Sequence, residues 1–452
     1  MSEFTSRRKV LGTLGMAGFG AAAAGASQAL GAPDAPPPIP GNALDVRGGA
    51  LDVRQFGAKG DGKTDDTAAF QKALAAAGKS GGVVRAPAGN YFFAGHLRFP
   101  RGVALLGDWV SVPSHNGLRE DAARGLPTPT AGGTTFLVTD GAGKEDAPAF
   151  INLAHNCTLR GVVIYYPNQI RDAEPVAYPW TIFMEGENAA VLDCELLNPY
   201  RAINATLAPR HLIRNIVGQP LRMGIWLDEI YDISRLENIH FNPIWTYGSK
   251  AYAWQQANGE GFVLGKADWL YVVNTFCFGY NMGYRFIATK AGACNGNLLG
   301  IGADNCNTCV WIDQASRYGL VITNGEFVSL GGPDPTALVV TGKHTGTVRL
   351  VNCAFWGDTL NQAVRVDGHG TVGLTDCTFV EWSAKKDGRP AVQGLGGTLL
   401  VRGCEFKHDA PQIEIQDRVR RAVISDNVMT GTVRISVAGR TRAVVGQNVG
   451  TA

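Results

Sequence analysis

Residues 224–241 read GIWLDEIYDISRLENIHF, and this stretch decides the fold. Apolar and polar residues alternate in its two halves, which predicts two short strands joined by a turn. The stretch also carries four carboxylates, an Arg, a His and a Trp. Its pattern recurs along the chain, and few of the copies are so polar. We therefore interpret it as one coil of a long repetitive β-structure, and as the coil that holds the chemistry.

The second half of the stretch, Leu236–Phe241, defines the repeat. Two apolar residues flank a polar one, an Asn, Asp or Gly follows, and a short apolar pair ends the motif. Most copies follow at steps of about 21 to 28 residues, a period that indicates stacked repeats. Short β-branched segments without helices favour a β-solenoid of about 10 to 12 coils. The other copies begin at Leu159, Val191, Ile213, Val272, Ile322, Leu350, Leu374, Val401, Ile424 and Val444.

The first half of the stretch, Gly224–Asp228, also recurs. If Ile225 and Leu227 face inward, strand alternation turns Trp226 and Asp228 outward. In stacked coils equivalent residues lie about 4.8 Å apart, so like side chains form ladders. One outer face then carries carboxylates, an Arg and aromatic rings. The same rule turns outward Phe183, Glu185, Asn204, Thr206, Arg285, Trp311 and Asp313.

The N-terminal part of the repeat region carries a family resemblance. Residues 56–74 read FGAKGDGKTDDTAAFQKAL, residues 81–91 read GGVVRAPAGNY, and a strand ends in LLGD at 105–108. These motifs resemble the start of the pectate-lyase-like superfamily. The resemblance covers about sixty residues and implies an all-β, right-handed, single-stranded parallel β-helix with an N-terminal capping helix. It does not specify an activity, because the superfamily holds hydrolases, lyases, epimerases and phage tailspikes, some of them trimers. A homo-oligomer is therefore an expectation by analogy only.

The capping helix is also predicted by periodicity. From about Asp66 to Ala77, one stripe carries Ala69, Phe70, Ala73, Leu74 and Ala77. Thr64 or Asp65 suits the N-cap position. For the acidic group Asp61, Asp65 and Asp66 we favour turn and cap roles over catalysis.

Composition sets limits on the function. The chain has 452 residues and a formal net charge of +2, which gives no sign of nucleic-acid binding. Nine cysteines without compact spacing argue against a disulfide framework. Cys306 and Cys309 lack a second pair at zinc spacing, so no metal site is predicted. We expect the cysteines to be free, buried core residues.

The first residues predict export and not fold. Residues 6–11, SRRKVL, resemble the twin-arginine export motif, and a short, weakly apolar stretch follows. We expect a signal peptide at 1–32, a Pro-rich linker at 33–46 and the β-helix domain at 47–452. The apolar run is too short to favour a membrane anchor, so the mature protein is expected to be periplasmic or secreted.

Two coils are longer than the rest. The steps from Gly161 to Asp193 and from Asn238 to Asn274 hold aromatic-rich inserts, 165–180 and 242–260. Long loops on a regular scaffold tend to carry function, and aromatic faces suit sugar rings. The alternative is that these rings fold back as a second small core.

Crowded carboxylates predict glycoside hydrolysis, which needs two carboxyl groups. Glu185 and Asp228 occupy equivalent positions two coils apart, about 9.6 Å by strand spacing, near the inverting range. Asp228 with Asp232 or Glu237 would be closer, but those two also suit turn caps paired with Arg235. The candidate catalytic residues are Asp228, Glu185, Asp232, Glu229 and Glu237. The candidate substrate-binding residues are Trp226, Arg285, Trp311, Trp245, Tyr247, Trp254, Lys266, Asn204 and His240, although His240 also suits a satisfied core position.

Two other functions stay open. A lyase or epimerase on a uronate polymer would use Arg222, Arg235, Arg285 or Lys266 to neutralise the sugar carboxylate, with calcium as a further option. The acid-rich face argues mildly against it. A non-catalytic glycan-binding module is the third alternative, although binding alone does not require crowded carboxylates. If the protein is a hydrolase, we expect a carbohydrate as its partner and no cofactor.

Overall fold

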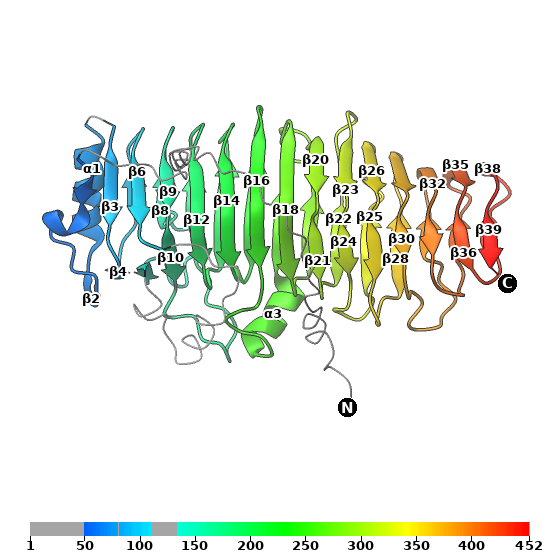
Figure 1. Cartoon of the computed structure of the whole chain (residues 1–452), viewed down its shortest axis with the longest axis horizontal. Coiled ribbons are helices and arrows are strands. Elements are labelled where there is room, and N and C mark those ends of the chain that lie inside the picture. The colour runs from blue at the N-terminus through cyan, green and yellow to red at the C-terminus, as the bar shows by residue number, and fades with distance from the viewer. Residues whose placement is uncertain (1–48, 80, 110–132, 452) are drawn as a thin grey trace, which may run out of the picture. The chain divides into compact units, whose positions relative to one another are not determined.

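The computed structural model describes residues 49–79, 81–109 and 133–451. They form stacked coils of parallel strands that run from the helix α1 to the strand β39 (Figure 1). The predicted parallel β-helix is confirmed. The signal peptide and linker expected at residues 1–46 lie outside the described residues. Within these residues, no helix has the length and apolar character needed to cross a membrane.

One sheet, sheet B, has 13 strands, slightly more than the ten to twelve coils expected. Its strands pair in parallel in the order of the chain. They are β5 (Leu97–Phe99), β8 (Ile151–Leu153), β11 (Trp180–Met184), β13 (Arg201–Thr206), β15 (Met223–Asp228), β17 (Glu260–Leu264), β19 (Met282–Phe286), β22 (Thr308–Ile312), β25 (Thr336–Val340), β28 (Gln362–Val366), β31 (Val392–Gly394), β34 (Ile413–Ile415) and β37 (Ile435–Val437).

The other sheet, sheet A, has 26 strands in two rows that lie side by side. Four long strands belong to both rows: β12 (Ala190–Leu196), β14 (Leu212–Gly218), β16 (Ser234–Phe241) and β18 (Leu270–Phe278). The first row also holds β1 (Leu51–Asp52), β3 (Val83–Ala86), β6 (Ala104–Gly107), β9 (Thr158–Arg160), β20 (Gly296–Leu299), β23 (Leu320–Thr323), β26 (Thr347–Val351), β29 (Thr371–Thr375), β32 (Gly397–Arg402), β35 (Val419–Ser425) and β38 (Arg442–Val445). The second row holds β2 (Asp61–Asp65), β4 (Gly89–Phe93), β7 (Thr134–Val138), β10 (Val162–Tyr165), β21 (Gly302–Asp304), β24 (Glu326–Val328), β27 (Ala354–Trp356), β30 (Thr378–Phe379), β33 (Glu405–Phe406), β36 (Val428–Thr430) and β39 (Val449–Thr451).

The chain bends between the two rows at a single left-handed residue per coil. Asn215, Asn238 and Asn274 have φ values of 55°, 51° and 52°. Asn tolerates this conformation better than most residues, which explains its place in the repeat. The side-chain amides also form a ladder along the sheet: Nδ2 of Asn238 donates to Oδ1 of Asn215 at 2.9 Å, and Nδ2 of Asn274 donates to Oδ1 of Asn238 at 3.1 Å.

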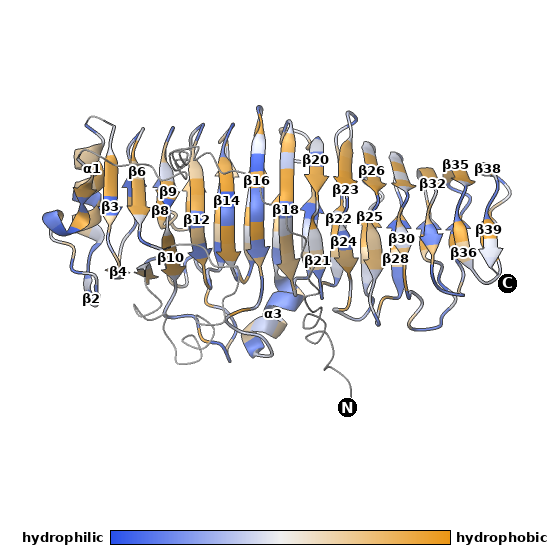
Figure 2. Ribbon diagram, viewed as in Figure 1, coloured by the Kyte–Doolittle hydropathy of each residue, from blue (hydrophilic) through white to orange (hydrophobic). Residues whose placement is uncertain are grey.

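The interior is built from the predicted apolar ladders. Ile225 and Leu227 are fully buried, while Trp226 between them is partly exposed, so the predicted alternation holds. In Figure 2 most strands are largely hydrophobic, and β16 carries clear hydrophilic bands. Phe355 and Phe379 stack with ring centroids 5.1 Å apart, close to the strand spacing. All nine cysteines are free and buried, as expected.

The N-terminal motif forms the helix α1 (Thr67–Ala77), preceded by the short helix η1 (Val53–Phe56). Its five predicted apolar residues are all buried. Phe70 packs edge-on against Tyr91, Phe93 and Phe136, with centroids 4.9 to 5.4 Å apart. The helix therefore covers the aromatic core at the N-terminal end of the coils (Figure 1).

The acidic residues before α1 have the predicted turn and cap roles. Asp61 accepts hydrogen bonds from the N–H groups of Lys63 and Thr64. Oδ1 of Asp65 accepts from the N–H and hydroxyl of Thr67. The N-cap position, however, is Asp66 and not Thr64 or Asp65.

Candidate active site on the outer face of sheet B

The outer face of sheet B carries the side chains that strand alternation predicted to face outward. Backbone pairing sets Asn204 beside Trp226 on β13 and β15, and Arg285 beside Trp311 on β19 and β22. Only Val263 separates Trp226 from Arg285. Because a polymer lying across the strands meets a new side chain about every 4.8 Å, this row can contact successive sugar residues.

A second outward row lies two residues further along the strands and consists of Glu185, Thr206 and Asp228. The pairing of Thr206 with Asp228 is direct, and Glu185 follows Met184, the partner of Ala205. The two carboxyl groups are thus two strands apart with Thr206 between them. By strand spacing their Cα atoms are about 9.6 Å apart, as the sequence predicted.

The two carboxylates differ in their surroundings. Oδ1 of Asp228 accepts hydrogen bonds from the N–H of Lys266 at 3.0 Å and from the hydroxyl of Thr289 at 2.8 Å. These contacts fix the side chain, which is 9% exposed. Glu185 is more open and lies 3.6 Å from the guanidinium of Arg98. Asp228 is therefore a rigid group and Glu185 a more mobile one.

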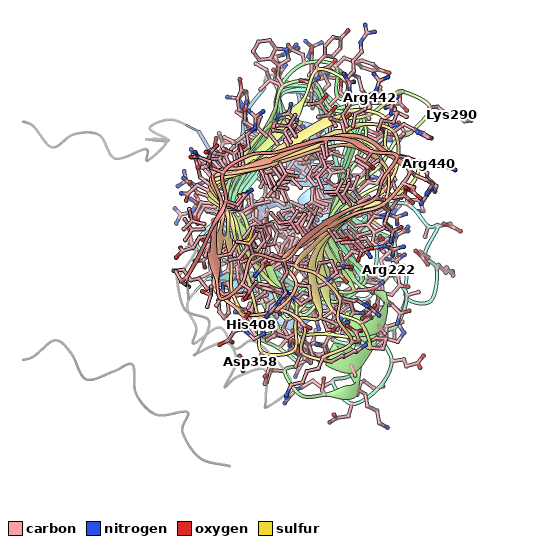
Figure 3. The ribbon with its side chains drawn as sticks, turned by 90° about the vertical axis from the view of Figure 1, so that its right-hand side faces the viewer. Arg222, Lys290, Asp358, His408, Arg440 and Arg442 are labelled. Carbon is pink, nitrogen blue, oxygen red and sulfur yellow. The ribbon has the colours of Figure 1, made fainter. Side chains whose placement is uncertain are left out.

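An ion-pair network joins the middle of the face. Glu260, 5% exposed, binds Arg222 at 3.0 Å and Arg285 at 2.7 Å. Arg285 also contacts Asp313 at 3.3 Å. Arg222 lies on the outside of the coils next to α3 (Lys250–Asn258), where it donates to the carbonyl of Asn258 (Figure 3). These ion pairs fix the position of the Arg285 guanidinium group.

The other candidates in the 224–241 stretch do not join this face. Glu229 sits in the turn after β15 with φ of 54°. Asp232 pairs with Arg210 at 2.8 Å, and not with Arg235 as the turn alternative assumed. Glu237 and His240 lie on β16 in sheet A, where His240 packs edge-on against Phe276. The close carboxylate pairs of Asp228 with Asp232 or Glu237 are therefore not formed across one face.

Trp245 and Trp254 of the second aromatic insert pack inward, as the packing alternative expected, whereas Tyr247 does not. Trp245 is 3% exposed in a second small core with Tyr165, Leu197 and Leu221. Trp254 packs on Tyr200 with ring centroids 5.8 Å apart. Tyr247 stays exposed beside Tyr252. Lys266 pairs with Asp268, so its ammonium group is engaged within its own loop.

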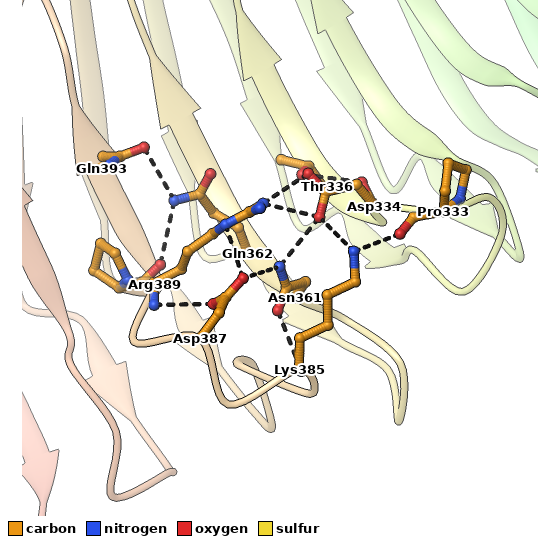
Figure 4. A network of polar contacts seen from close by, with 10 residues as sticks. Pro333, Asp334, Thr336, Asn361, Gln362, Lys385, Asp387, Arg389 and Gln393 are labelled. Atoms are coloured by element: carbon orange, nitrogen blue, oxygen red, sulfur yellow. Dashed lines mark hydrogen bonds and ion pairs between the residues drawn. The ribbon is translucent and has the colours of Figure 1, made fainter.

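The C-terminal end of the face holds a pocket that the sequence did not indicate. A hollow of about 350 Å³ is lined by Thr336, Gln362 and Gln393 from β25, β28 and β31, and by Arg365. Its lining also includes Asp334, which binds Arg389, Lys385 and Asn361 (Figure 4). Burial acts to raise the pKa of Asp334, but the hydrogen bonds from these partners outweigh it and hold the pKa below its usual value. Arg365 is exposed and has no hydrogen-bond or ion-pair partner among the described residues. The described residues contain no group of three or more His, Cys, Asp or Glu side chains arranged to hold a metal ion.

Comparison with known families agrees with this architecture. A family model described as "Rhamnogalacturonase A/epimerase, pectate lyase-like" matches residues 50–161. The match lies in the N-terminal coils of the parallel β-helix. Among solved structures, this β-helix protein resembles the A-module of the mannuronan C-5 epimerase AlgE6 of Azotobacter vinelandii, with 15% identity, a TM-score of 0.52, and coverage of 89% of this chain and 99% of that one.

Two further similarities are more limited. The pre-mature gene product 12 of bacteriophage phi29 superposes with a TM-score of 0.55 at 13% identity, over 88% of this chain and 57% of that one. Alginate lyase 7 of Azotobacter vinelandii is 59% identical over 44 residues, which are 10% of this chain and 5% of that protein. The non-secreted LysM effector LysM19 of Penicillium expansum is 36% identical over 72 residues, 16% of this chain and 6% of that protein. The chain thus spans about a twentieth of the curated relatives it matches, and the structural likenesses concern the fold alone.

Proposed function

We propose that this β-helix protein is a carbohydrate-active enzyme that binds a polysaccharide along the outer face of sheet B and hydrolyses it with Glu185 and Asp228. The observation that carries the proposal is the outward row Glu185–Thr206–Asp228, which sets two carboxyl groups two strands apart beside Trp226. That separation is close to the about 6.5–9.5 Å that inverting glycosidases use to hold a water between their carboxyl groups. The family description, which names a rhamnogalacturonase, supports the substrate class.

The surroundings of the two groups suggest their roles. Asp228 is fixed by Lys266 and Thr289 through Oδ1, so Oδ2 is the atom available to orient and deprotonate a water molecule. Glu185 is the more exposed group and can follow the glycosidic oxygen to which it donates its proton. Trp226 offers its ring to the apolar face of a bound sugar.

The test is cleavage of a panel of neutral and acidic polysaccharides, with reducing ends and unsaturated-uronate absorbance followed in parallel. We expect new reducing ends without new absorbance, and a loss of about 10²–10⁴-fold in rate for Asp228→Asn and for Glu185→Gln. Glu237→Gln, on the other sheet, is the matched control and should keep the full rate. Full activity of Asp228→Asn would refute the assignment.

A second candidate is a uronate lyase or epimerase. The observation that favours it is the set of arginines on the same face. Arg365 in its pocket has no partner in the described part of the chain and suits a sugar carboxylate. New unsaturated-uronate absorbance would replace the hydrolase by the lyase. In that case Arg365→Gln should raise KM for an acidic polymer and leave KM for a neutral one unchanged.

We further propose that the enzyme acts outside the cytoplasm, because residues 1–32 have the pattern of a twin-arginine signal peptide. Fractionation of cells that express the full chain checks this. A periplasmic or secreted product that has lost about thirty residues is expected, and retention of Arg7→Lys/Arg8→Lys protein in the cytoplasm would support the route. An unprocessed cytoplasmic product of the unaltered chain would contradict it.

A further inference from the structure

A hollow lies on the outer face of sheet A, away from the residues proposed for catalysis. Its volume is about 300 Å³, and it is centred on the coil that holds β20 and β21. In this coil Gly300 takes the place that Asn274 and Asn324 have in the two adjacent coils, as the strand register on either side of it shows. Gly302 likewise stands between Phe276 and Glu326. The missing side chain at Gly300 therefore opens the hollow, while the ring of Phe276 lies over Gly302.

The missing side chain at Gly300 interrupts the amide ladder. Asn274 donates its Nδ2 to Asn238, and Asn324 accepts on its Oδ1 from Nδ2 of Asn352 at 2.8 Å. Oδ1 of Asn274 and Nδ2 of Asn324 therefore have no side-chain partner in the described residues. They are two strand spacings apart, about 9.6 Å between Cα atoms, with the hollow between them. One is an acceptor and the other a donor, the pair of groups that sugar hydroxyls satisfy.

Two carboxyl groups stand further along the same hollow. Asp304 pairs with Val328, two residues beyond Glu326, so the two acidic residues are about 8 Å apart at Cα from one strand spacing and two residues of rise. Burial raises the pKa of Asp304, and only the N–H of Asn305 acts against it. Glu326 is exposed and has no ion-pair or hydrogen-bond partner for its carboxylate in the described part of the chain. Neither carboxyl group has an ion-pair partner in the described part of the chain, so both can contact a ligand.

Aromatic rings complete the walls. Trp356 is 41% exposed and pairs with Val328, which places it two strands from Asp304 in one outward row. Phe276 lines the side nearest the N-terminus. Exposed rings beside amide and carboxyl groups are the usual make-up of a site that holds a ligand with both apolar and polar faces.

The charge of the hollow selects among sugars. Its lining has two carboxyl groups and no Lys or Arg, whereas the face of sheet B carries several arginines. A uronate would bring a third negative charge without a partner, which costs binding energy. Uncharged sugar residues carry no such cost.

We propose that this hollow is a second saccharide-binding site, one that takes an uncharged sugar residue between Asn274 and Asn324 with its apolar face towards Trp356. It is independent of the catalytic proposal, since it shares no residue with the row Glu185–Thr206–Asp228. An enzyme with both sites would hold a polysaccharide surface on one face while it cleaves a chain on the other.

Gly300→Asn is the decisive variant. Gly300 has φ of +63°, similar to that of Asn274 and Asn324, and a Cβ atom there would meet nothing within 4 Å. The new amide should therefore complete the ladder, occupy the hollow and leave the fold intact or more stable. Gly143→Asn, at another open position with φ of +74°, is the control for the substitution itself.

The experiment is calorimetric titration of the mature chain, carrying Asp228→Asn so that no probe is cleaved, with cellohexaose, maltohexaose, mannohexaose and a hexauronate. We expect at least one neutral probe to bind, a loss of tenfold or more for Gly300→Asn and for Trp356→Ala, and unchanged binding for Gly143→Asn. Equal affinity of Gly300→Asn and its parent for every probe, or no neutral probe bound by the parent, would overturn the proposal. Because the readout is binding in an inactivated background, its failure is separate from a failure of the cleavage assay.

Discussion

The ring of His211 is fully buried and its Nε2 lies 2.8 Å from the hydroxyl of Ser234. Nδ1 lies 2.6 Å from the carbonyl oxygen of Ala208, to which it donates its proton, so Nε2 accepts from the Ser234 hydroxyl. Burial lowers the pKa of His211 to about 4, and the nearby charge of Arg235 acts in the same direction. The native state therefore holds this imidazole neutral.

The free energy of unfolding should decrease as the pH is lowered, because His211 is neutral in the native state. Between the unfolded pKa near 6.5 and the native value near 4, the unfolded state binds a proton that the native state does not, so the free energy of unfolding decreases as pH decreases. The expected loss is about 3 kcal/mol between pH 7 and pH 4. Urea denaturation at pH 7, 6, 5 and 4 measures it, and a flat profile would contradict the assignment.

His344 should contribute to the same slope and can be removed. It is buried, neither ring nitrogen has a hydrogen-bond partner among the residues that the structure describes, and burial lowers its pKa to about 4. His344→Leu should flatten the profile and stabilise the protein at pH 5, because no polar contact is lost.

Asp66 should be the acidic residue of the N-terminal motif on which stability depends. Its carboxylate, 1% exposed, accepts from the N–H groups of Lys59 at 2.6 Å and Gly60 at 3.1 Å. Asp66→Ala leaves two N–H groups without partners, and a loss of about 2–4 kcal/mol in the free energy of unfolding is expected. Asp61→Ala, at an exposed turn, should cost less than half of that in the same denaturation experiment. Equal losses would argue against this role for Asp66.

The amide ladder gives a fourth prediction. Asn238 has φ of 51° and makes hydrogen bonds to Asn215 and Asn274. Asn238→Ala removes both hydrogen bonds and also forces an alanine into the left-handed conformation. We therefore expect a destabilisation of about 1–3 kcal/mol. Asn238→Gly removes the contacts but keeps a residue that accepts this conformation, and its Tm should lie between those of Asn238→Ala and the parent. A Gly variant less stable than the Ala variant would rule out backbone strain as a cause.

The cysteines should be inert in the folded protein. All nine are buried and free, and burial raises the pKa of Cys194 and Cys294 to about 12. Since the thiolate is the reactive form, a thiol reagent should label the native chain slowly and all nine sites at once in denaturant. Rapid labelling of any one cysteine without denaturant would show that its coil opens.

The sequence predicted the features that repeat. Inward Ile225 and Leu227, the repeated Asn position and the helix with Phe70 follow from local pattern, because each coil packs only on its neighbours. Contacts with residues far away in the sequence could not be predicted from local pattern. Asp228 is fixed by Lys266 and Thr289, and Trp245 is buried among Tyr165 and Leu221. Aromatic content alone cannot tell a packed insert from an exposed one.

The hollow at Gly300 was not predicted from the sequence, because it arises where a side chain is absent. The interval from Asn274 to Asn324 is about two periods, a sign in the sequence that one coil between them lacks the repeated Asn. The strand register places Gly300 between Asn274 and Asn324, and the hydrogen bonds of these two amides leave an acceptor on one side of the gap and a donor on the other. The Arg365 pocket likewise depends on three strands brought together by stacking.

The amide ladder has a direction. Asp193 can only accept when ionised, so Asn215, whose Nδ2 lies 2.7 Å from Oδ1 of Asp193, must donate towards it. That choice turns the carbonyl of Asn215 towards Asn238, and the same constraint passes from Asn238 to Asn274. A single carboxylate three coils away thus decides which atom Asn274 presents at the gap, and none of these amides can flip alone. A ligand held there would meet a polar track with a defined sense, and could bind in only one of its two orientations along the coils.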